Sequence, residues 1–414
     1  MRAALAVMAV GLACTATPVG DGRNAREPDG IPTPRSAPAT AYTMRDANRG
    51  AEPYSAWFAD SDGRTVYFGL SPFWTLWWAT DGDFAADLEQ TGDLLIGRFD
   101  LATERFGAPL VLRDEGAGRT SVWDVLAHSS GRVCFTTYFD AMGCVDPATG
   151  EVQRFEAAGP GLNELVEGPG GDLYATRYSS QPLGEPAGSF GAVAVIGLDG
   201  RLLREHRLPN PPGGLTAPKS LAVDPATGHV WVNTDTFMAD GSTVHETLEL
   251  DAAGTVVSRQ GGDPELHFPS FAPDGTGFFA ETEAGSLYLR IVPPNANANA
   301  TPLRLPLGPI AALDFVQDIK HGADGEVVLA LWSGKLFIVR PDADGWTARA
   351  VSLQRLSECA APESQSLVYS AFTFGDRVCA TLFCGARIVC ASQDEQGGEG
   401  RADHAQSRRH QGER

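Results

Sequence analysis

The sequence predicts an all-β protein, a seven-bladed β-propeller closed by an N-terminal strand, and three observations support this fold. One unit recurs along the chain: an apolar-alternating strand, a tight Gly or Asp-Gly turn, and a second strand rich in Val, Tyr, Phe and Trp. Its interval of roughly 40 to 70 residues suits a four-stranded blade. No long segment carries apolar residues at three-and-four spacing, which argues against helices.

Each unit is marked by its tight turn. The seven turns are Asp62-Gly63, Ser130-Gly131, Gly170-Gly171, Thr227-Gly228, Asp274-Gly275, Asp324-Gly325 and Gly375-Asp376. The seventh unit has three evident strands and lacks a fourth. A strand near Ala41 to Arg45 would supply it, close the ring and remove the exposed edges that a sheet must otherwise protect. Six blades, with one unit misread, is the alternative count.

The N-terminus has the pattern of a signal peptide over residues 1–14. Arg2 precedes an uninterrupted small and apolar run from Ala3 to Ala13, too short to span a bilayer, and then comes Cys14. The Gly-Leu-Ala before Cys14 resembles a bacterial lipobox, although Gly11 stands where Leu is usual. Lipidation of Cys14 would anchor the protein in the periplasm or at the cell surface. Cleavage near Ala16 would instead give a secreted protein.

The ends of the mature chain read as disordered, because their composition cannot bury enough apolar surface to fold. We expect a tether over residues 15–39, the propeller over residues 40–392 and a tail over residues 393–414. The formal net charge of -20 argues against nucleic acid and against an anionic membrane surface. We expect a monomer whose membrane contact is limited to a lipid on Cys14.

Six further cysteines fit disulfides in an oxidising compartment. Two similar stretches, which begin Arg132-Val133-Cys134 and Arg377-Val378-Cys379, lead to Cys144 and Cys390. Each pair would join neighbouring strands of one hairpin. By elimination Cys359 would meet Cys384, a weaker pairing because connectivity does not follow from sequence alone.

The loops between second and third strands carry the insertions, on the face where function tends to sit. They are Ser71 to Gly92, Ser179 to Gly191 and Thr234 to Ser242. The first contains Phe73 with Trp74, Trp77 and Trp78, an apolar contact surface for a protein, peptide or glycan. The alternative is that these rings fold back and cap the first blade.

Polar residues stand where inner strands begin, at positions that would face the channel mouth. They are Asp124, Asn163 with Glu164, Lys219, His267, and Gln317 with Asp318; Asn233 and Asp235 end a second strand on the same face. Oxygen ligands from Asn163, Glu164 and Asp318 suit a divalent cation such as Ca²⁺ or Mg²⁺. His267 suits a general base, and Asp124, Lys219 and Asn233 suit ligand contacts. An inert, solvated channel is the competing interpretation.

One stretch of the sequence resembles a known family of repeats. Pro218-Lys219-Ser220-Leu221-Ala222-Val223-Asp224-Pro225, followed by Gly228-His229-Val230-Trp231-Val232-Asn233, resembles the repeat of NHL, gluconolactonase-like and streptogramin-lyase-like propellers. The resemblance implies the fold more than a function. The gluconolactonase-like proteins hold a catalytic metal with Glu, Asn and Asp at the channel mouth, and the lyases use His and Glu near magnesium. Here Glu164, Asn163, Asp318 and His267 are similar in type, although their spacing matches neither motif.

Two function hypotheses follow. The first is an extracytoplasmic, lipid-anchored propeller that acts as a ligand-binding or protein-interaction scaffold through its loop-rich face. The second is a metal-dependent hydrolase or lyase of the gluconolactonase-like or streptogramin-lyase-like kind. We favour the scaffold, because the catalytic case lacks a transferable motif; whether the protein is an enzyme stays open.

Overall fold

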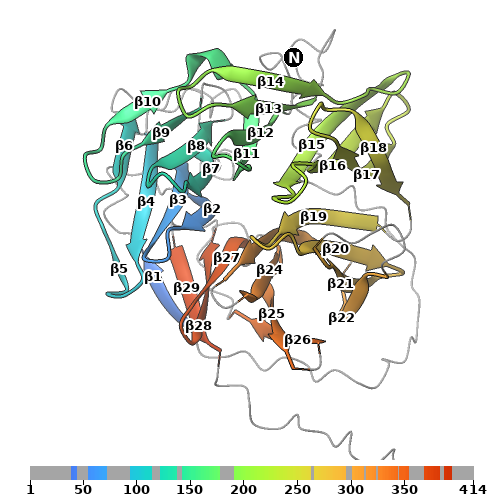
Figure 1. Ribbon diagram of the computed structural model, residues 1–414. Helices are drawn as coiled ribbons and strands as arrows, with labels where there is room; N and C mark the ends of the chain where they lie inside the picture. The colour runs from blue at the N-terminus through green and yellow to red at the C-terminus, as the bar shows by residue number, and fades with distance from the viewer. Residues whose placement is uncertain are drawn as a thin grey trace, which may run out of the picture.

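The protein folds into a ring of seven antiparallel sheets (Figure 1), in a computed structural model. This confirms the seven-bladed propeller and removes the six-bladed alternative. The structure describes residues 39–43, 55–71, 94–113, 122–137, 142–177, 191–262, 265–294, 301–311, 314–322, 325–343, 345–353, 368–382 and 387–393. Within these ranges there is no α-helix, and Glu156–Ala158 forms a short 3₁₀ segment. Nothing in that part of the chain is helical, long and apolar enough to cross a membrane.

The first four blades follow one another in chain order, each starting at the channel and ending at the outside. Blade 1 has β2 (Ser55–Ser61), β3 (Thr65–Ser71) and β4 (Leu94–Asp100), with β5 (Arg105–Phe106) and β6 (Leu110–Arg113) both paired to β4. Blade 2 has β7 (Val122–Ala127), β8 (Val133–Thr137), β9 (Gly143–Val145) and β10 (Val152–Arg154). Blade 3 has β11 (Leu162–Glu167), β12 (Leu173–Arg177), β13 (Ala192–Ile196) and β14 (Leu202–Arg207). Blade 4 has β15 (Gly214–Val223), β16 (Val230–Met238), β17 (Thr243–Leu250) and β18 (Val256–Gly261).

The last three blades complete the ring. Blade 5 has β19 (Glu265–Phe271), β20 (Gly277–Glu283), β21 (Ser286–Val292) and β22 (Leu303–Pro309). Blade 6 has β23 (Val316–His321), β24 (Val327–Leu331), β25 (Lys335–Asp342) and β26 (Gly345–Ser352). Blade 7 has β27 (Val368–Phe374), β28 (Arg377–Leu382) and β29 (Arg387–Ser392), and its outer strand is β1 (Ala39–Thr43) from the other end of the chain. The blue β1 therefore lies beside the red β29 in Figure 1.

The predicted turns connect the first and second strands of the blades. Gly228 and Gly275 show why glycine stands there: their φ angles of 70° and 89° lie in the left-handed region, which a side chain disfavours. One expectation differs in detail. The predicted loop from Thr234 to Ser242 is mostly strand, because β16 and β17 pair as far as Phe237 and Thr243 and leave a short turn at the tip.

Both hairpin disulfides are confirmed. Cys134 and Cys144 face one another across β8 and β9, with Cα atoms 3.9 Å apart. Cys379 and Cys390 do the same across β28 and β29, at 4.0 Å. The expected Cys359–Cys384 pair lies outside the described residues, as do the signal peptide, Cys14 and the tryptophans Trp74, Trp77 and Trp78. The same holds for the tether except Ala39, which belongs to β1, and for the tail except Gln393, which donates to the Arg377 carbonyl.

Neighbouring blades pack through seams, the interfaces between adjacent sheets. The six buried apolar clusters of the described residues fill six of the seven seams. In the seam of blades 5 and 6, for example, Phe278, Leu289, Leu329 and Val339 are buried together. Burial of this apolar surface is the main force that holds the ring.

The seam of blades 4 and 5 is built differently. Asn233 Nδ2 and Thr247 Oγ1, both on blade 4, donate to the Leu266 carbonyl of blade 5 at 3.0 and 2.9 Å. Trp231 lies against Phe279 and Phe271, with ring centroids 5.0 and 6.4 Å apart. In this seam, hydrogen bonds between side chains and backbone therefore provide part of the contact between blades that buried apolar clusters provide in the other six seams.

Candidate functional site

A bulge interrupts the pairing of every inner strand at the same place. The register between first and second strands shifts at Ala56/Ala59, Val122/Val125, Leu162/Leu165, Pro218/Ser220, His267/Ser270, Val316/Asp318 and Val368/Ala371. A bulge bends its strand and redirects side chains. The predicted polar residues Asp124, Asn163, Glu164, Lys219, Gln317 and Asp318 all lie within or at these bulges, which a strict two-residue alternation would not reveal.

Side chains from four inner strands form hydrogen bonds with the inner strand of the next blade. In each case a carboxylate or hydroxyl oxygen accepts a backbone N–H from the neighbouring inner strand. The bonds are Ala127 N to Asp60 Oδ2 (2.9 Å), Leu165 N to Asp124 Oδ2 (2.8 Å), Leu221 N to Glu164 Oε2 (3.1 Å) and Ala59 N to Ser370 Oγ (3.1 Å). The carboxylates are therefore held in fixed positions around the channel.

A cavity of about 970 Å³ occupies the channel. Asp60, Asp124, Glu164, Asp318 and Lys320 are among its lining residues, which we call the channel cluster. The lining also includes Gly63, Gly322 and Gly375, which belong to the turns between first and second strands. The channel cavity therefore extends from the bulges to the turn face, opposite the face that carries the long loops.

The charges of the channel cluster are strongly coupled. Burial raises the pKa of Asp124 to about 7 and of Asp318 to about 6, while the nearby Lys320 charge opposes both shifts. Burial, followed by the charges of Asp124 and Asp318, also raises the pKa of Glu164. For Lys320 burial lowers the pKa, but the four surrounding carboxylates outweigh it and raise the pKa. The cluster therefore holds a lysine among carboxyls, and burial raises the pKa of three of them, Asp124, Glu164 and Asp318.

The predicted metal ligands lie near one another in part. Glu164 and Asp318 share the cavity and interact through their charges. Asn163, one residue before Glu164, is buried and its Oδ1 has no hydrogen-bond partner in the described part of the chain. Within those residues, no group of three or more His, Cys, Asp or Glu is arranged to hold a metal. A divalent cation at Asn163, Glu164 and Asp318 stays a prediction.

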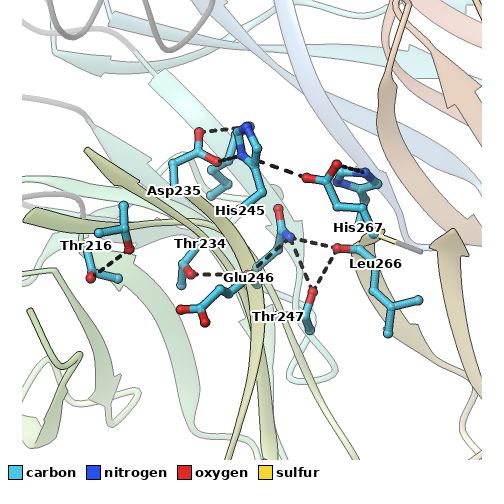
Figure 2. A network of polar contacts seen from close by, with 12 residues as sticks. Thr216, Thr234, Asp235, His245, Glu246, Thr247, Leu266 and His267 are labelled. Carbon is cyan, nitrogen blue, oxygen red and sulfur yellow. Dashed lines mark hydrogen bonds and ion pairs between the residues drawn. The ribbon is translucent and has the colours of Figure 1, made fainter. Parts of the chain in front are cut away.

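A second polar site lies at the loop-rich end of blades 4 and 5 (Figure 2). Lys219 Nζ is 3.0 Å from Asp235 Oδ2, and His245 Nδ1 is 2.5 Å from Asp235 Oδ1. Glu265 continues the chain of contacts, 3.9 Å from His245 and 3.6 Å from His267. His267 Nε2 also contacts Thr282 Oγ1 at 3.2 Å. We call Lys219, Asp235, His245, Glu265 and His267 the rim network.

The two histidines of the rim network differ in proton affinity. The hydrogen bond to Asp235 raises the pKa of His245 above its ordinary value. Burial, with the charges of Lys219 and His245, lowers the pKa of His267 to about 4. His267 is therefore neutral at pH 7, and its low proton affinity weakens it as a general base. Its catalytic role stays a prediction.

The rim network borders a pocket of about 460 Å³, which we call the rim pocket. Its lining includes Val244 and His245 of β17, Glu265 of β19 and Thr282 of β20. The predicted residue Asn233 lies deeper, in the seam below, where its amide contacts Leu266. The predicted residues thus separate into two groups: Asp124, Glu164 and Asp318 in the channel, and Lys219 and His267 at the rim.

Comparison with known proteins gives the fold but no family. No protein-family model matches the chain, and no curated protein matches it in sequence. Among solved structures, a chain of the mitotic checkpoint complex is similar at a TM-score of 0.52 and 10% identity, over 92% of this chain and 99% of that one. The extracellular domain of the hybrid two component system BT3049 from B. thetaiotaomicron has a TM-score of 0.49 and 12% identity, over 86% and 42% of the two chains. YCF48 bound to D1 peptide has 0.48 and 13%, over 88% and 100%. At 10% identity the likeness to the checkpoint-complex chain is one of fold alone.

Proposed function

We propose that this protein is an extracytoplasmic binding scaffold whose loop-rich face recognises a protein, peptide or glycan ligand. The observation that carries the proposal is the rim network. Five polar side chains from β15, β16, β17 and β19 contact one another in sequence at the edge of the rim pocket. Side chains locked by mutual contacts meet a ligand at little cost in conformational entropy.

The rim presents both polar and apolar groups to a partner. His245 and Lys219 keep 42% and 37% of their side chains exposed, although both contact the buried Asp235. Val244, next to His245, is 45% exposed and lines the same pocket. An exposed apolar residue beside oriented donors and acceptors is the composition of a recognition site.

The location outside the cytoplasm rests on the two hairpin disulfides, since such bonds persist in oxidising compartments. Anchoring would follow from lipidation of Cys14. Metabolic labelling with a radioactive fatty acid tests this directly: we expect label on the wild-type chain and none on Cys14→Ser. Equal labelling of both chains would contradict the anchor at this residue.

Peptide and glycan arrays test the recognition surface. The labelled protein is compared with the rim double variant Val244→Ser/His245→Gln and with the control Val257→Ser, which alters another exposed valine of blade 4. We expect array signals that the control retains and that the rim variant loses by at least ~10-fold, the effect of removing a central contact. The proposal fails if no signal depends on the rim variant.

A further inference from the structure

The charges that line the channel cavity do not balance. Two of the acidic lining residues have close partners: Glu326 pairs at 2.8 Å with Arg340, which also lines the cavity, and Glu167 accepts hydrogen bonds from Ser129. The channel cluster keeps four carboxyl groups against the single ammonium of Lys320. A carboxylate without a counter-charge is costly inside a protein, so this arrangement favours entry of a second cation.

The carboxylates keep oxygens available. Asp60 and Glu164 each use one oxygen to accept a backbone N–H of the next blade, and their other oxygens make no hydrogen bond in the described ranges. Asp318 is only 9% exposed, lines the cavity and has an Oδ2 with no partner among those residues. An unsatisfied buried carboxylate oxygen calls for a donor that the described chain does not supply.

Lys320 has hydrogen-bond donors without acceptors among the described residues. Its ammonium interacts with the four carboxylates through charge, yet no hydrogen bond or ion pair within 4 Å joins it to any residue that the structure describes. An ammonium has three N–H donors. The channel cavity therefore offers both unfilled acceptors and unfilled donors.

The cavity has the size for an organic ligand. Its volume of about 970 Å³ lies at the upper end of the range for small-molecule sites, roughly 300 to 1,000 Å³, and far exceeds the space a metal ion fills. We propose that the channel cavity is a second ligand site, entered from the turn face, that binds a small molecule bearing both an ammonium or guanidinium group and a carboxylate, as a basic amino acid does. The cationic group meets Asp60, Glu164 and Asp318, and the carboxylate meets Lys320.

This site is independent of the rim, so either can fail without the other. Calorimetric titration of the full-length protein uses L-arginine and L-lysine as probes. L-citrulline replaces the guanidinium by a neutral group, and agmatine lacks the carboxylate. We expect binding of arginine or lysine, and binding at least ~10-fold weaker for both single-ended analogues, since charge-assisted bonds are the strong ones.

Glu164→Gln is the matched variant, because the amide oxygen still accepts the Leu221 N–H while the negative charge is lost. We expect it to weaken arginine binding at least ~10-fold. The control Leu203→Ser, at an exposed position of the same blade, should bind as the wild type does. Thermal unfolding checks that each variant is folded.

The titrations also separate an amino-acid site from a metal site. No response to arginine or lysine overturns the proposal, as does equal affinity for citrulline. Binding of Mg²⁺ or Ca²⁺ that Glu164→Gln abolishes, without an arginine response, would assign the cavity to a metal instead.

Discussion

The seam of blades 4 and 5 and the seam of blades 5 and 6 meet at the same blade, yet they are held by different forces. Phe278 and its neighbours bury a continuous apolar cluster between blades 5 and 6. On the opposite side of blade 5, Asn233 and Thr247 converge on the Leu266 carbonyl, and the rim network lies at the loop-rich end of that seam. The difference shows that blades of one repeat fold can pack in two ways. Six seams are filled by buried apolar clusters, and the seam of blades 4 and 5 holds polar side chains in fixed orientations.

Removing the apolar contact should have the largest effect. Phe278 is 1% exposed and packs edge-on against Trp346, with ring centroids 5.3 Å apart. Phe278→Ala should lower the free energy of unfolding by about 3–5 kcal/mol, measured by guanidinium denaturation. Leu303→Ala, at an exposed position of the same blade, is the control and should change stability by less than about 0.5 kcal/mol. Equal effects of the two substitutions would remove the basis of the comparison.

The polar seam should respond more weakly. Asn233→Ala removes one of two donors to the Leu266 carbonyl and should cost about 1–2 kcal/mol of unfolding free energy. The double variant with Thr247→Val takes away both side-chain donors and should cost more than the two single changes together, as a double-mutant cycle would reveal. Strict additivity would mean that the two bonds act separately.

The smallest effect on stability, and the most specific signal, is expected at the rim. Asp235→Asn removes the carboxylate that raises the pKa of His245, so NMR titration should report a lower pKa for that imidazole. Glu265→Gln should lower it less, since Glu265 is 3.9 Å away. Because the folded-state pKa is raised, the stability that His245 contributes is complete below the unfolded pKa, about 6.5, and disappears as the pH rises through the folded value. An unchanged His245 pKa in Asp235→Asn would show that the contact with Asp235 does not stabilise the protonated imidazole.

The repeat could be predicted from sequence because each turn has a local signature. A glycine beside a second small or polar residue, between two segments of alternating apolar residues, indicates both the turn and the two strands that it joins. Asp124, Glu164 and Asp318 were predicted to face the channel because they are polar residues at the starts of inner strands. Lys320 was missed, although it stands two residues after Asp318 on one strand, and period-two alternation places such residues on one face.

The rim network was harder to predict. Asp235 and His245 become partners only through the register of β16 and β17, in a segment whose polar sequence suggested a loop. The link from His245 to Glu265 also crosses from blade 4 to blade 5, and the repeat that marks the blades does not specify which side chains meet across a seam. The bulges add a further obstacle, since a shift of one residue changes the face on which every later side chain lies.

The strand β1 sets the order of events during folding. Its partner β29 lies at the other end of the propeller, and the bond from Ala59 N to Ser370 Oγ joins residues 311 positions apart. Contacts of such separation form late, because the intervening chain must first become compact. During synthesis β1 is made before the other strands of the propeller, and it stays unpaired until its partner β29 has been made. A chain cut short before β29 would keep the β27–β28 hairpin but leave β1 without its partner strand, so the ring closes only after the last strand of the propeller has been made.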